Sequence, residues 1–244
     1  MNLGLEGHAA LVTGGARGIG AAIALALARE GCDVAIVDRE AGPVDTILAL
    51  GRKGLAIAAD VREPAAAARA VEEVLRAFGR LDILVCSAGV TADATVWKMT
   101  EQQWDEVIAV NLKGVFNYNQ AAARVFREQK SGKIVNLSSI NGLRGKFGQA
   151  NYAASKAGVI ALSKSLAREL GKYGVNVNAI APGMMETAMS RALPAAVVEA
   201  ARAETVLQRL GTPEDCANLA VFLCSDRARH ITGDVILIDG GQYL

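Results

Sequence analysis

The chain has 244 residues, of which 52% are hydrophobic and 21% are charged, and its formal net charge at pH 7 is +1. This composition excludes a disordered protein, and the balanced charge gives no support to binding of nucleic acid or of a membrane surface. A chain of this length can bury an extensive core, and we expect a single domain over residues 1–244.

Cysteine usage and the first residues predict a cytoplasmic protein. The N-terminal sequence M-N-L-G-L-E-G lacks the basic start and the apolar core of a signal peptide. The four cysteines, at positions 32, 86, 216 and 224, form no C-x-x-C pair, which is typical of reduced thiols and not of a disulfide or metal framework. The two histidines have no ligand cluster around them in the sequence, so no metal site is predicted.

Apolar runs and helical segments alternate along the whole chain. Seven apolar runs are typical of buried parallel strands, at residues 8–13, 34–37, 55–59, 83–85, 133–137, 175–181 and 235–238. Helices are predicted at residues 21–30, 41–52, 64–78, 101–129 and 150–171. Residues 183–212 are less regular and are expected to form short helices over the carboxyl edge of the sheet. The alternation predicts a doubly wound α/β fold, with one seven-stranded parallel sheet between two layers of helices.

A glycine-rich turn, T-G-G-A-R-G-I-G, follows the first predicted strand. In such a turn small residues let the backbone approach a pyrophosphate, and the N-terminus of the next helix offers free N–H donors. A flexible turn without a ligand is the alternative, but the strand–turn–helix context favours nucleotide binding. The residues expected to contact the nucleotide here are Gly14, Arg17, Gly18, Ile19 and Gly20.

Two acidic residues follow the second and third predicted strands. Asp38 can accept hydrogen bonds from a ribose diol and would repel a 2′-phosphate, which favours NAD over NADP. Arg17 and Arg39 point the other way, because a guanidinium pairs well with a phosphate, so NADP stays open. Asp60 could either cap the next helix or accept a hydrogen bond from an adenine amine.

Residues 139–156, S-I-N-G-L-R-G-K-F-G-Q-A-N-Y-A-A-S-K, carry the candidate catalytic groups. On a helix, Tyr152 and Lys156 lie on one face, where the cation would favour the phenolate and lower the pKa of the phenol. Ser139 can add a hydrogen bond, and such a trio can move a proton to or from an alcohol oxygen. Taken alone, Y-x-x-x-K is common, and an incidental pair on a surface helix is the better explanation.

Asn111 interrupts an apolar stretch of the longest predicted helix, between Val110 and Leu112. Either its side chain faces solvent, or it disturbs the hydrogen bonds of the helix and holds a water molecule. The sequence alone leaves both possibilities open.

The substrate is expected to be recognised between the catalytic Ser and Tyr and in the segment over the sheet edge. Arg144 and Lys146 either belong to a solvated basic loop or attract an anionic substrate, such as a carboxylate or a phosphopantetheine thioester. The methionines after Gly183 either shape an adaptable apolar pocket or pack within their own loop. The candidate substrate-binding residues are Asn141, Arg144, Phe147, Met184 and Met185.

Together these motifs resemble the short-chain dehydrogenase/reductase family over essentially the whole chain. The matching features are T-G-x-x-x-G-x-G at 13–20, Asp60, A-G at 88–89, Asn111, Ser139, Y-x-x-x-K at 152–156 and P-G at 182–183. Within the family the chain is most similar to the 3-oxoacyl-[acyl-carrier-protein] reductase group. The stretches G-Q-A-N-Y-A-A-S-K-A-G at 148–158 and I-T-G-D-V-I-L-I-D-G-G at 231–241 carry that similarity.

The resemblance implies a Rossmann-type domain, with a cofactor-binding part over residues 1–110 and a catalytic part over residues 111–244. It implies that Tyr152 is the general acid/base and that Ser139 holds the substrate oxygen. Lys156 would lower the pKa of Tyr152 and bind the nicotinamide ribose, and Asn111 would hold a water in a proton relay. Further cofactor contacts are implied at Asp60, Val61, Ala88, Gly89, Tyr152, Lys156, Pro182, Gly183 and Thr187.

The implied activity is NAD(P)-dependent interconversion of a secondary alcohol and a ketone by hydride transfer, with a 3-oxoacyl or 3-hydroxyacyl thioester as the best substrate class. The resemblance also implies a homotetramer. One interface would pair the helices at 101–129 and 150–171, and another would involve the C-terminal strand and tail.

Two departures from the family pattern leave alternatives open. Cys86-Ser87 stands where the family usually has Asn-Asn, which puts the hydrogen bonds of those residues in doubt. Asp38 is unlike the pattern of biosynthetic reductases that use NADPH, so one alternative is a catabolic dehydrogenase of a free cyclic, aromatic or sugar-like alcohol. A non-catalytic nucleotide-binding subunit is the other alternative. Such a protein would be free to lose Ser139, Tyr152 or Lys156, yet all three are present.

Overall fold

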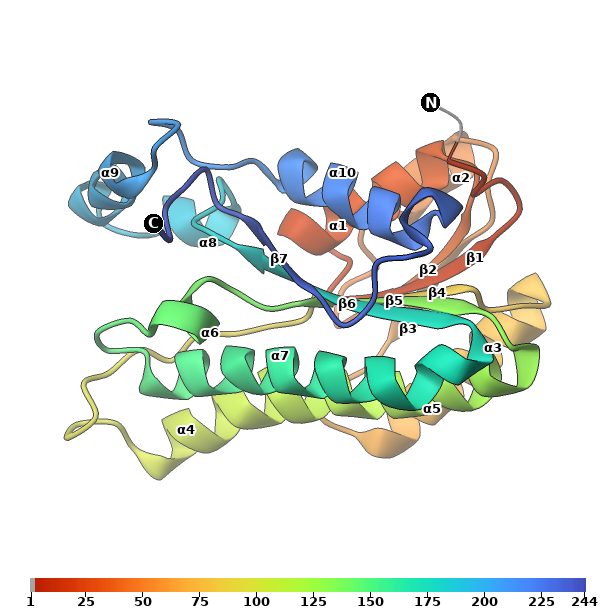
Figure 1. The fold of residues 1–244 in the computed structure, drawn as a ribbon, viewed down its shortest axis with the longest axis horizontal. Helices are drawn as coiled ribbons and strands as arrows, with labels where there is room; N and C mark the ends of the chain where they lie inside the picture. Colours follow the sequence, from red (N-terminus) through yellow and green to blue (C-terminus); the bar gives the residue numbers. More distant parts are fainter. Residues whose placement is uncertain (1–2) are drawn as a thin grey trace.

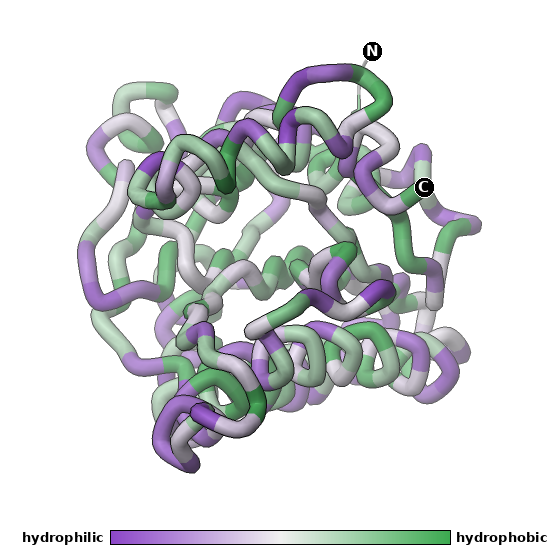
Figure 2. Tube along the Cα trace, turned by 90° about the vertical axis from the view of Figure 1, so that its left-hand side faces the viewer, coloured by the Kyte–Doolittle hydropathy of each residue, from purple (hydrophilic) through white to green (hydrophobic). Residues whose placement is uncertain are grey.

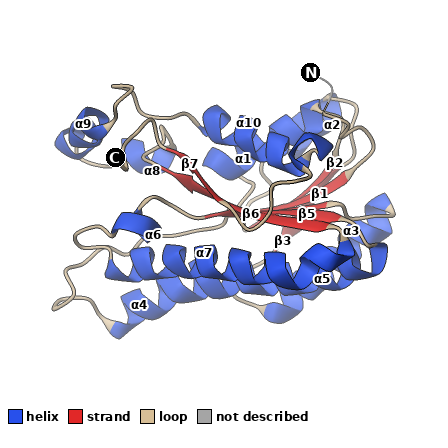
Figure 3. Cartoon of the chain, in the orientation of Figure 1, coloured by secondary structure: helices blue, strands red, loops and turns tan. Residues whose placement is uncertain are grey.

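The structure is a computed structural model that describes residues 3–244, and its strands form one seven-stranded sheet between two layers of helices (Figures 1 and 3). The strand order is β3-β2-β1-β4-β5-β6-β7, and all neighbours run parallel. This confirms the predicted doubly wound α/β fold. Met1 and Asn2 lie outside the described residues, and they are the first two residues of the N-terminal sequence that lacks the pattern of a signal peptide.

The strands lie where the apolar runs predict them. The five inner strands are buried by helices on both faces of the sheet, whereas the residues of the two edge strands are mostly half-buried or exposed. They are β1 (Ala9–Thr13), β2 (Asp33–Asp38), β3 (Gly54–Ala58), β4 (Ile83–Cys86), β5 (Gly132–Leu137), β6 (Val175–Pro182) and β7 (Val235–Ile238). Among the described helices, none has the length and apolar character that a membrane span requires.

The helices form one layer of α1, α2 and α10 and another of α3, α4, α5 and α7 (Figure 1). They are α1 (Gly18–Arg29), α2 (Val44–Ala49), α3 (Pro64–Phe78), α4 (Glu101–Ile108), α5 (Gly114–Gln129), α6 (Asn141–Arg144), α7 (Ala150–Leu170), α8 (Ala188–Arg191), α9 (Ala195–Glu204) and α10 (Pro213–Cys224). The short turns are η1 (Ala109–Lys113), η2 (Gly171–Tyr173) and η3 (Asp226–Ala228).

Three helices differ from the sequence-based expectation. The helix expected at 41–52 is shorter, because Gly42 has a φ of 65° and Pro43 occupies the N-cap of α2. The helix expected at 101–129 is divided by η1, which is a π-helical turn. Helix α10 was not predicted, although Thr212 and Asp215 form a capping box at its start.

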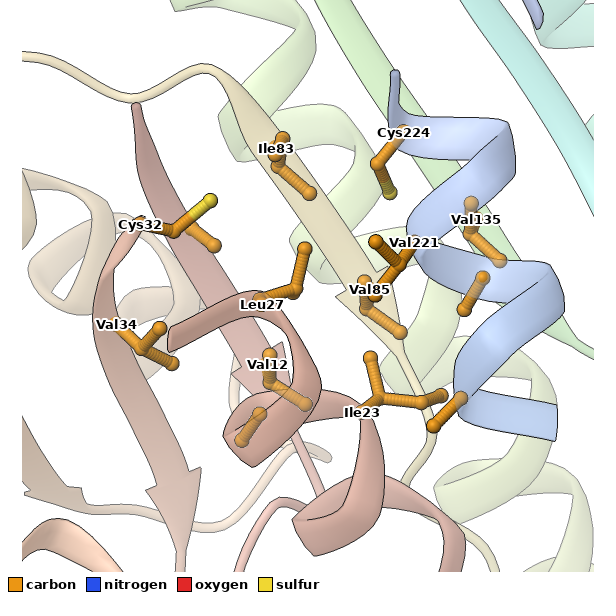
Figure 4. Packing of buried hydrophobic residues seen from close by; sticks show 14 of the residues in the cluster. Val12, Ile23, Leu27, Cys32, Val34, Ile83, Val85, Val135, Val221 and Cys224 are labelled. Atoms are coloured by element: carbon orange, nitrogen blue, oxygen red, sulfur yellow. The ribbon is translucent and has the colours of Figure 1, made fainter. Parts of the chain in front are cut away.

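The core lies on both faces of the sheet. On one face, Ile23 and Leu27 of α1 and Val221 of α10 pack against Val12 and Val85 of the sheet (Figure 4). On the other face, α5 contributes the large buried side chains to a second apolar cluster. Burial of each side chain of this size stabilises the fold by about 1.5–3 kcal/mol relative to an exposed one, so the two clusters fix both helical layers against the sheet.

One edge of the sheet carries the loops that matter for function. Since all strands are parallel, their carboxyl ends meet at the same edge, where open α/β sheets bind ligands. Helices α6, α8 and α9 lie at this edge, on the left of Figure 1, and it faces the viewer in Figure 2. Helices α8 and α9 are the short helices expected within residues 183–212.

The glycine-rich turn depends on close backbone approaches. Gly14 has a φ of 66°, and a Cβ there would lie 2.6 Å from the backbone nitrogen of Ala88. A Cβ on Gly20 would overlap the carbonyl oxygen of Gly14. The turn therefore has no room for side chains at either position.

We expect Gly20→Ala to destabilise the protein by about 2 kcal/mol, because the added methyl group must displace the Gly14 carbonyl even though Ala favours a helix. Urea unfolding measures the change. Gly171→Ala is the control, since a Cβ there meets no atom within 4 Å. Equal stabilities of the two variants would contradict the predicted clash.

Candidate active site

The structure brings Ser139, Tyr152 and Lys156 together at the carboxyl edge of the sheet. Ser139 follows the end of β5, and the other two lie in the first two turns of α7. The side chains of Tyr152 and Ser139 are hydrogen-bonded. The Nζ atom of Lys156 lies 5.7 Å from the centre of the Tyr152 ring. The trio predicted from the sequence is thus a cluster in space.

Lys156 is a buried cation, with 4% of its surface exposed. Its Nζ donates a hydrogen bond of 2.8 Å to the carbonyl oxygen of Leu137, the last residue of β5. Burial lowers the pKa of this ammonium from 10.5 to about 8, because the charged form is poorly solvated there. Ser138 fixes the same turn by donating to the Lys156 carbonyl at 2.8 Å. The lysine is therefore held close to its titration point near neutral pH.

The pKa of Tyr152 differs from the sequence-based expectation. Burial raises it above its ordinary value of 10.0, since the phenolate would be poorly solvated. The hydrogen bond with Ser139 lowers the pKa, and the carboxylate of Asp93 raises it. Desolvation is the largest of these effects, so the net shift is upward and not the lowering expected from Lys156. The phenol is therefore protonated at neutral pH.

Asn111 lies in the π-helical turn η1 and is completely buried, which excludes a solvent-facing side chain. Its Oδ1 accepts the N–H of Val90 at 2.8 Å, and its Nδ2 donates to the Val90 carbonyl at 3.0 Å. Nδ2 also lies 3.2 Å from Oγ of Ser155, which donates to the Tyr152 carbonyl at 2.7 Å. Asn111 thus joins the long helix to the loop after β4 and to α7.

The loop after β4 runs directly beside this cluster. A Cβ on Gly89 would lie 3.5 Å from Oδ1 of Asn111 and 3.6 Å from Nζ of Lys156. The absence of a side chain at this position lets the loop pack directly beside both polar atoms. Ala88 adjoins Gly14 of the glycine-rich turn, so the A-G pair connects the two predicted halves of the site.

Asn141 links Ser139 to a chain of amides. Its backbone N–H donates to Oγ of Ser139 at 3.1 Å, and its Nδ2 donates to Oε1 of Gln149 at 3.0 Å. Gln149 in turn donates to the carboxylate of Asp93 at 2.8 Å. Sequence reasoning singled out neither Gln149 nor Asp93, although Gln149 is part of the G-Q-A-N-Y stretch. Phe147, between these groups in the chain, is 84% exposed.

Arg144 lies at the surface, but its guanidinium is held by partners within the chain. It ends α6, and its Nη1 donates to the backbone oxygen of Gln242 at 2.8 Å. Its Nη2 pairs with Glu204 at 3.0 Å, and its Nε reaches Oδ1 of Asn141 at 3.4 Å. Each guanidinium nitrogen therefore has a partner within the chain, which gives the side chain a structural anchor.

The two methionines after Gly183 occupy different environments. Met185 is buried and packs over Gly211, to which its backbone is bridged. Met184 is half-buried, and its backbone N–H donates to Oε1 of Gln242 at 2.8 Å. Met189 is 58% exposed on α8. Of these, Met184 is the one whose backbone is tied to the C-terminal segment.

The glycine-rich turn and the end of β2 form a cradle. Arg17 is the N-cap of α1 and makes no side-chain hydrogen bond to the helix, so no side chain caps its first N–H groups. The methyl group of Thr187 lies 3.7 Å from where a Cβ on Gly18 would be. The carboxylate of Asp38 accepts the N–H groups of Ala16 at 3.1 Å and Arg39 at 2.7 Å, which fixes the carboxylate beside the turn.

Asp60 does not cap α3, whose N-cap is Glu63 without a side-chain hydrogen bond. Its carboxylate binds Arg62 through Nε, Nη2 and the backbone N–H. The hydrogen bonds to Arg62 lower the pKa of Asp60. Asn117 of α5 holds the same loop by donating to the Val61 carbonyl at 3.0 Å.

The turn at Cys86-Ser87 is held without the Asn pair that is usual in the family. Cys86 is buried, and burial raises the pKa of its thiol to about 12. Its sulfur accepts a hydrogen bond of 3.4 Å from Nδ2 of Asn119. The backbone N–H of Ser87 donates to the Thr13 carbonyl at 3.1 Å. Among the described residues, no cluster of His, Cys, Asp or Glu side chains could hold a metal ion.

Comparisons with known proteins agree on one family. The family model described as Enoyl-(Acyl carrier protein) reductase matches residues 14–242. The chain is 46% identical over 240 residues to the 3-oxoacyl-[acyl-carrier-protein] reductase FabG of Staphylococcus aureus (strain Mu50), covering 96% of this chain and 98% of the relative. It is 40% identical over 245 residues to the FabG of Escherichia coli (strain K12), covering 99% and 100%.

A solved structure supports the same family. The chain resembles a structure described as a candidate short-chain alcohol dehydrogenase from Sinorhizobium meliloti 1021, with a TM-score of 0.93 and 38% sequence identity. The similarity covers 99% of this chain and 98% of that one. At this identity and coverage the agreement extends to the whole sheet and both helical layers.

The burial of Lys156 predicts a cost in stability that depends on pH. The pKa of Lys156 is about 8 in the folded protein, against an ordinary value of 10.5 for the solvated side chain in the unfolded chain. The unfolded chain therefore binds more protons between these two pH values. The free energy of unfolding of the wild type should therefore rise through this window, and Lys156→Met should not share the rise. We expect the difference in unfolding free energy, wild type minus Lys156→Met, to rise by about 3 kcal/mol between pH 7 and pH 10.5.

Urea unfolding of both proteins at several pH values measures the gain, and subtracting the two curves removes the titrations that they share. A difference in unfolding free energy that stays constant across the window would contradict the depressed pKa of Lys156.

Proposed function

The chain belongs to the short-chain dehydrogenase/reductase family, and from this premise we propose that it interconverts a 3-oxoacyl and a 3-hydroxyacyl thioester by hydride transfer with NAD(H). The observation that carries the chemistry is the hydrogen-bonded pair of Ser139 and Tyr152 beside the buried Lys156. The substrate class is supported by the relatives from Staphylococcus aureus and Escherichia coli, both of which are named 3-oxoacyl-[acyl-carrier-protein] reductases.

The residues present fit a nicotinamide dinucleotide. Gly18 leaves space for a pyrophosphate at the uncapped N-terminus of α1, and Thr187 lies on the other side of that turn, while Gly14 lets the turn pack against Ala88. We propose further contacts from Asp38 to a ribose, from Asp60 and Val61 to the adenine, and from Ile19, Ala88, Pro182 and Gly183 around the rest of the cofactor. The cofactor, when bound, supplies or accepts the hydride.

In the reductive direction, we assign Tyr152 as the proton donor to the carbonyl oxygen. The raised pKa of Tyr152 keeps the phenol protonated, so it is ready to act as an acid. Ser139 would bind the same oxygen, because its Oγ is held by the N–H of Asn141 and its hydroxyl, which lies beside the Tyr152 phenol, can turn to donate to the substrate. Lys156, with a pKa of about 8, can return a proton to Tyr152 near neutral pH, and Asn111 holds the adjacent loop in place.

The choice of NAD over NADP rests on Asp38. Its carboxylate is fixed beside the glycine-rich turn by two backbone N–H groups. The negative charge of this carboxylate would repel a 2′-phosphate bound there. Arg17 and Arg39 are exposed, and Arg39 acts on the carboxylate of Asp60 by lowering its pKa. We therefore propose NAD as the preferred cofactor, with oxidation of a free secondary alcohol as the alternative that this preference favours.

We also propose a homotetramer. Trp104 of α4 and Phe116 of α5 are 41% and 44% exposed, and Leu237 of β7 and Tyr243 of the C-terminal tail are 42% and 41% exposed. These apolar side chains lie on the two surfaces expected to form subunit contacts. The four buried free cysteines support the proposed cytoplasmic location.

We expect Tyr152→Phe to lower kcat for acetoacetyl thioester reduction by at least about 1,000-fold, because no other phenol hydrogen-bonds Ser139 in the described site. NADH binding, measured by fluorescence titration, should stay within about twofold of the wild type. Tyr173→Phe is the matched control, since Tyr173 lies in η2, beyond the end of α7 that is far from Tyr152. Wild-type kcat in Tyr152→Phe would remove the phenol from the mechanism.

Substrate class is decided by the same assay with acetoacetyl thioesters and with cyclic, aromatic and sugar-like ketones. Highest kcat/KM on a thioester supports the proposal, and highest kcat/KM on a free ketone supports the alternative.

Asp38→Asn should shift the ratio of kcat/KM for NADPH over NADH upward by about tenfold, since a neutral amide no longer repels the 2′-phosphate. The amide keeps an oxygen for the N–H of Ala16, so the turn is disturbed less than by Ala. Asp45→Asn on α2 makes the same change in charge at an exposed residue and should leave the ratio unchanged. An equal ratio in both variants would show that Asp38 does not set the preference.

A further inference from the structure

The segment after β7 returns to the candidate active site. Two glycines with positive φ, Gly240 at 62° and Gly241 at 83°, turn the chain, and Asp239 closes the turn by accepting the N–H groups of Gly241 at 3.0 Å and Tyr243 at 2.7 Å. This turn points Gln242 inward, where only 4% of its surface is exposed. A buried polar side chain in a tail needs partners, and Gln242 has them on three other segments.

Each polar group of Gln242 binds a different partner. Its Oε1 accepts the N–H of Met184 at 2.8 Å, which fixes the backbone after Gly183. Its Nε2 donates to Oε2 of Glu204 at 3.0 Å, which holds the last residue of α9. Its backbone oxygen accepts Nη1 of Arg144 at 2.8 Å, which holds the end of α6. One residue thereby joins the tail to both sides of the sheet edge.

Arg144 closes the set into a ring of contacts. Its Nη2 pairs with the same Glu204 oxygen that Gln242 binds, at 3.0 Å. The hydrogen bond from Gln242 is the largest cause of the lowered pKa of Glu204, followed among the lowering effects by Arg144, so both partners favour the carboxylate. Lys146 is a further cation that acts on this carboxylate. The ion pair itself is partly exposed, and such pairs are weak without geometric support.

The ring also reaches the proposed catalytic residues. Nε of Arg144 lies 3.4 Å from Oδ1 of Asn141, whose backbone N–H donates to Oγ of Ser139 at 3.1 Å. On the other side, a Cβ on Gly183 would lie 2.6 Å from Oε1 of Gln242, so the amide packs directly on the segment proposed to contact the cofactor. A shift of Gln242 would therefore move both the Asn141–Ser139 segment and the segment at Gly183.

We propose that Gln242 is a positioning residue that locks the 183–204 segment and α6 into one arrangement around Ser139. Its amide holds Met184 and Glu204, and through Arg144 it sets the position of Asn141. The role in turnover rests on the proposed function, whereas the structural lock does not. Nothing in the reaction requires Gln242 to touch a substrate atom.

The test exchanges the side chains of Gln242 and Glu204. Gln242→Glu keeps an acceptor for Met184 but replaces the donor to Glu204 with a second carboxylate. Adding Glu204→Gln restores a donor–acceptor hydrogen bond between positions 204 and 242 and returns the net charge to that of the wild type, while Arg144 loses the carboxylate oxygen that it shares with Gln242. Glu199→Gln is the control, since Glu199 lies on the same helix in an exposed ion pair with Arg202.

Amide hydrogen exchange of the substrate-free protein is the first readout. We expect Gln242→Glu to speed exchange of the Met184 amide by about tenfold, with faster exchange through α9, and the double variant to return both toward wild-type rates. Glu199→Gln should have wild-type rates at Met184. Unchanged exchange in Gln242→Glu, or no recovery in the double variant, would overturn the lock.

Turnover of the acetoacetyl thioester is the second readout. We expect kcat to fall about tenfold in Gln242→Glu and to recover in the double variant, because Ser139 is displaced and then realigned. If the wild type reduces no thioester or ketone, the proposed function fails while hydrogen exchange still decides the lock. If exchange responds but kcat does not, the lock stands and its role in positioning Ser139 is overturned.

Discussion

The buried ammonium of Lys156 is the constraint on which the candidate active site depends. A desolvated charge is costly, and it persists here because the Leu137 carbonyl at the end of β5 accepts it at 2.8 Å. This hydrogen bond requires α7 to lie against the carboxyl edge of the sheet. Gly142 of α6 then approaches so closely that a Cβ would lie 2.7 Å from the Lys156 carbonyl carbon. The position of one cation thus determines how three elements meet.

Deeper in the core, buried amide and hydroxyl side chains form a hydrogen-bonded network between the helices and the sheet. Asn119 of α5 donates to Asn136 of β5 at 2.9 Å, and Asn136 donates to Ser163 of α7 at 3.0 Å. All three are buried at or below 1% exposure. A satisfied polar network in a low-dielectric interior admits few alternative packings. The helices that carry Asn111 and Tyr152 are therefore fixed to the sheet by specific bonds in addition to apolar contact.

The strands, the glycine-rich turn and the catalytic trio could be predicted because each is encoded locally, by an apolar run or by spacing along a helix. Features that depend on distant partners could not. The division of the long helix at Asn111 involves Val90 and Ser155, and the anchor of Arg144 is Gln242, which is 98 residues away in the chain. The upward pKa shift of Tyr152 was missed because sequence shows neighbouring charges but not the depth of burial.

The π-helical turn at Ala109–Lys113 also sets the phase of the helix that contains it. An α-helix advances about 100° per residue, and a π turn inserts extra chain, so α4 and α5 present differently rotated faces. Helix α4 uses its face to pack on α7, and α5 uses its own to pack on α3 and the sheet. Removal of one residue here would rotate every later side chain of α5 out of its contacts. In this segment the number of residues is under tighter restraint than their identity, and length variation between related chains should be found elsewhere.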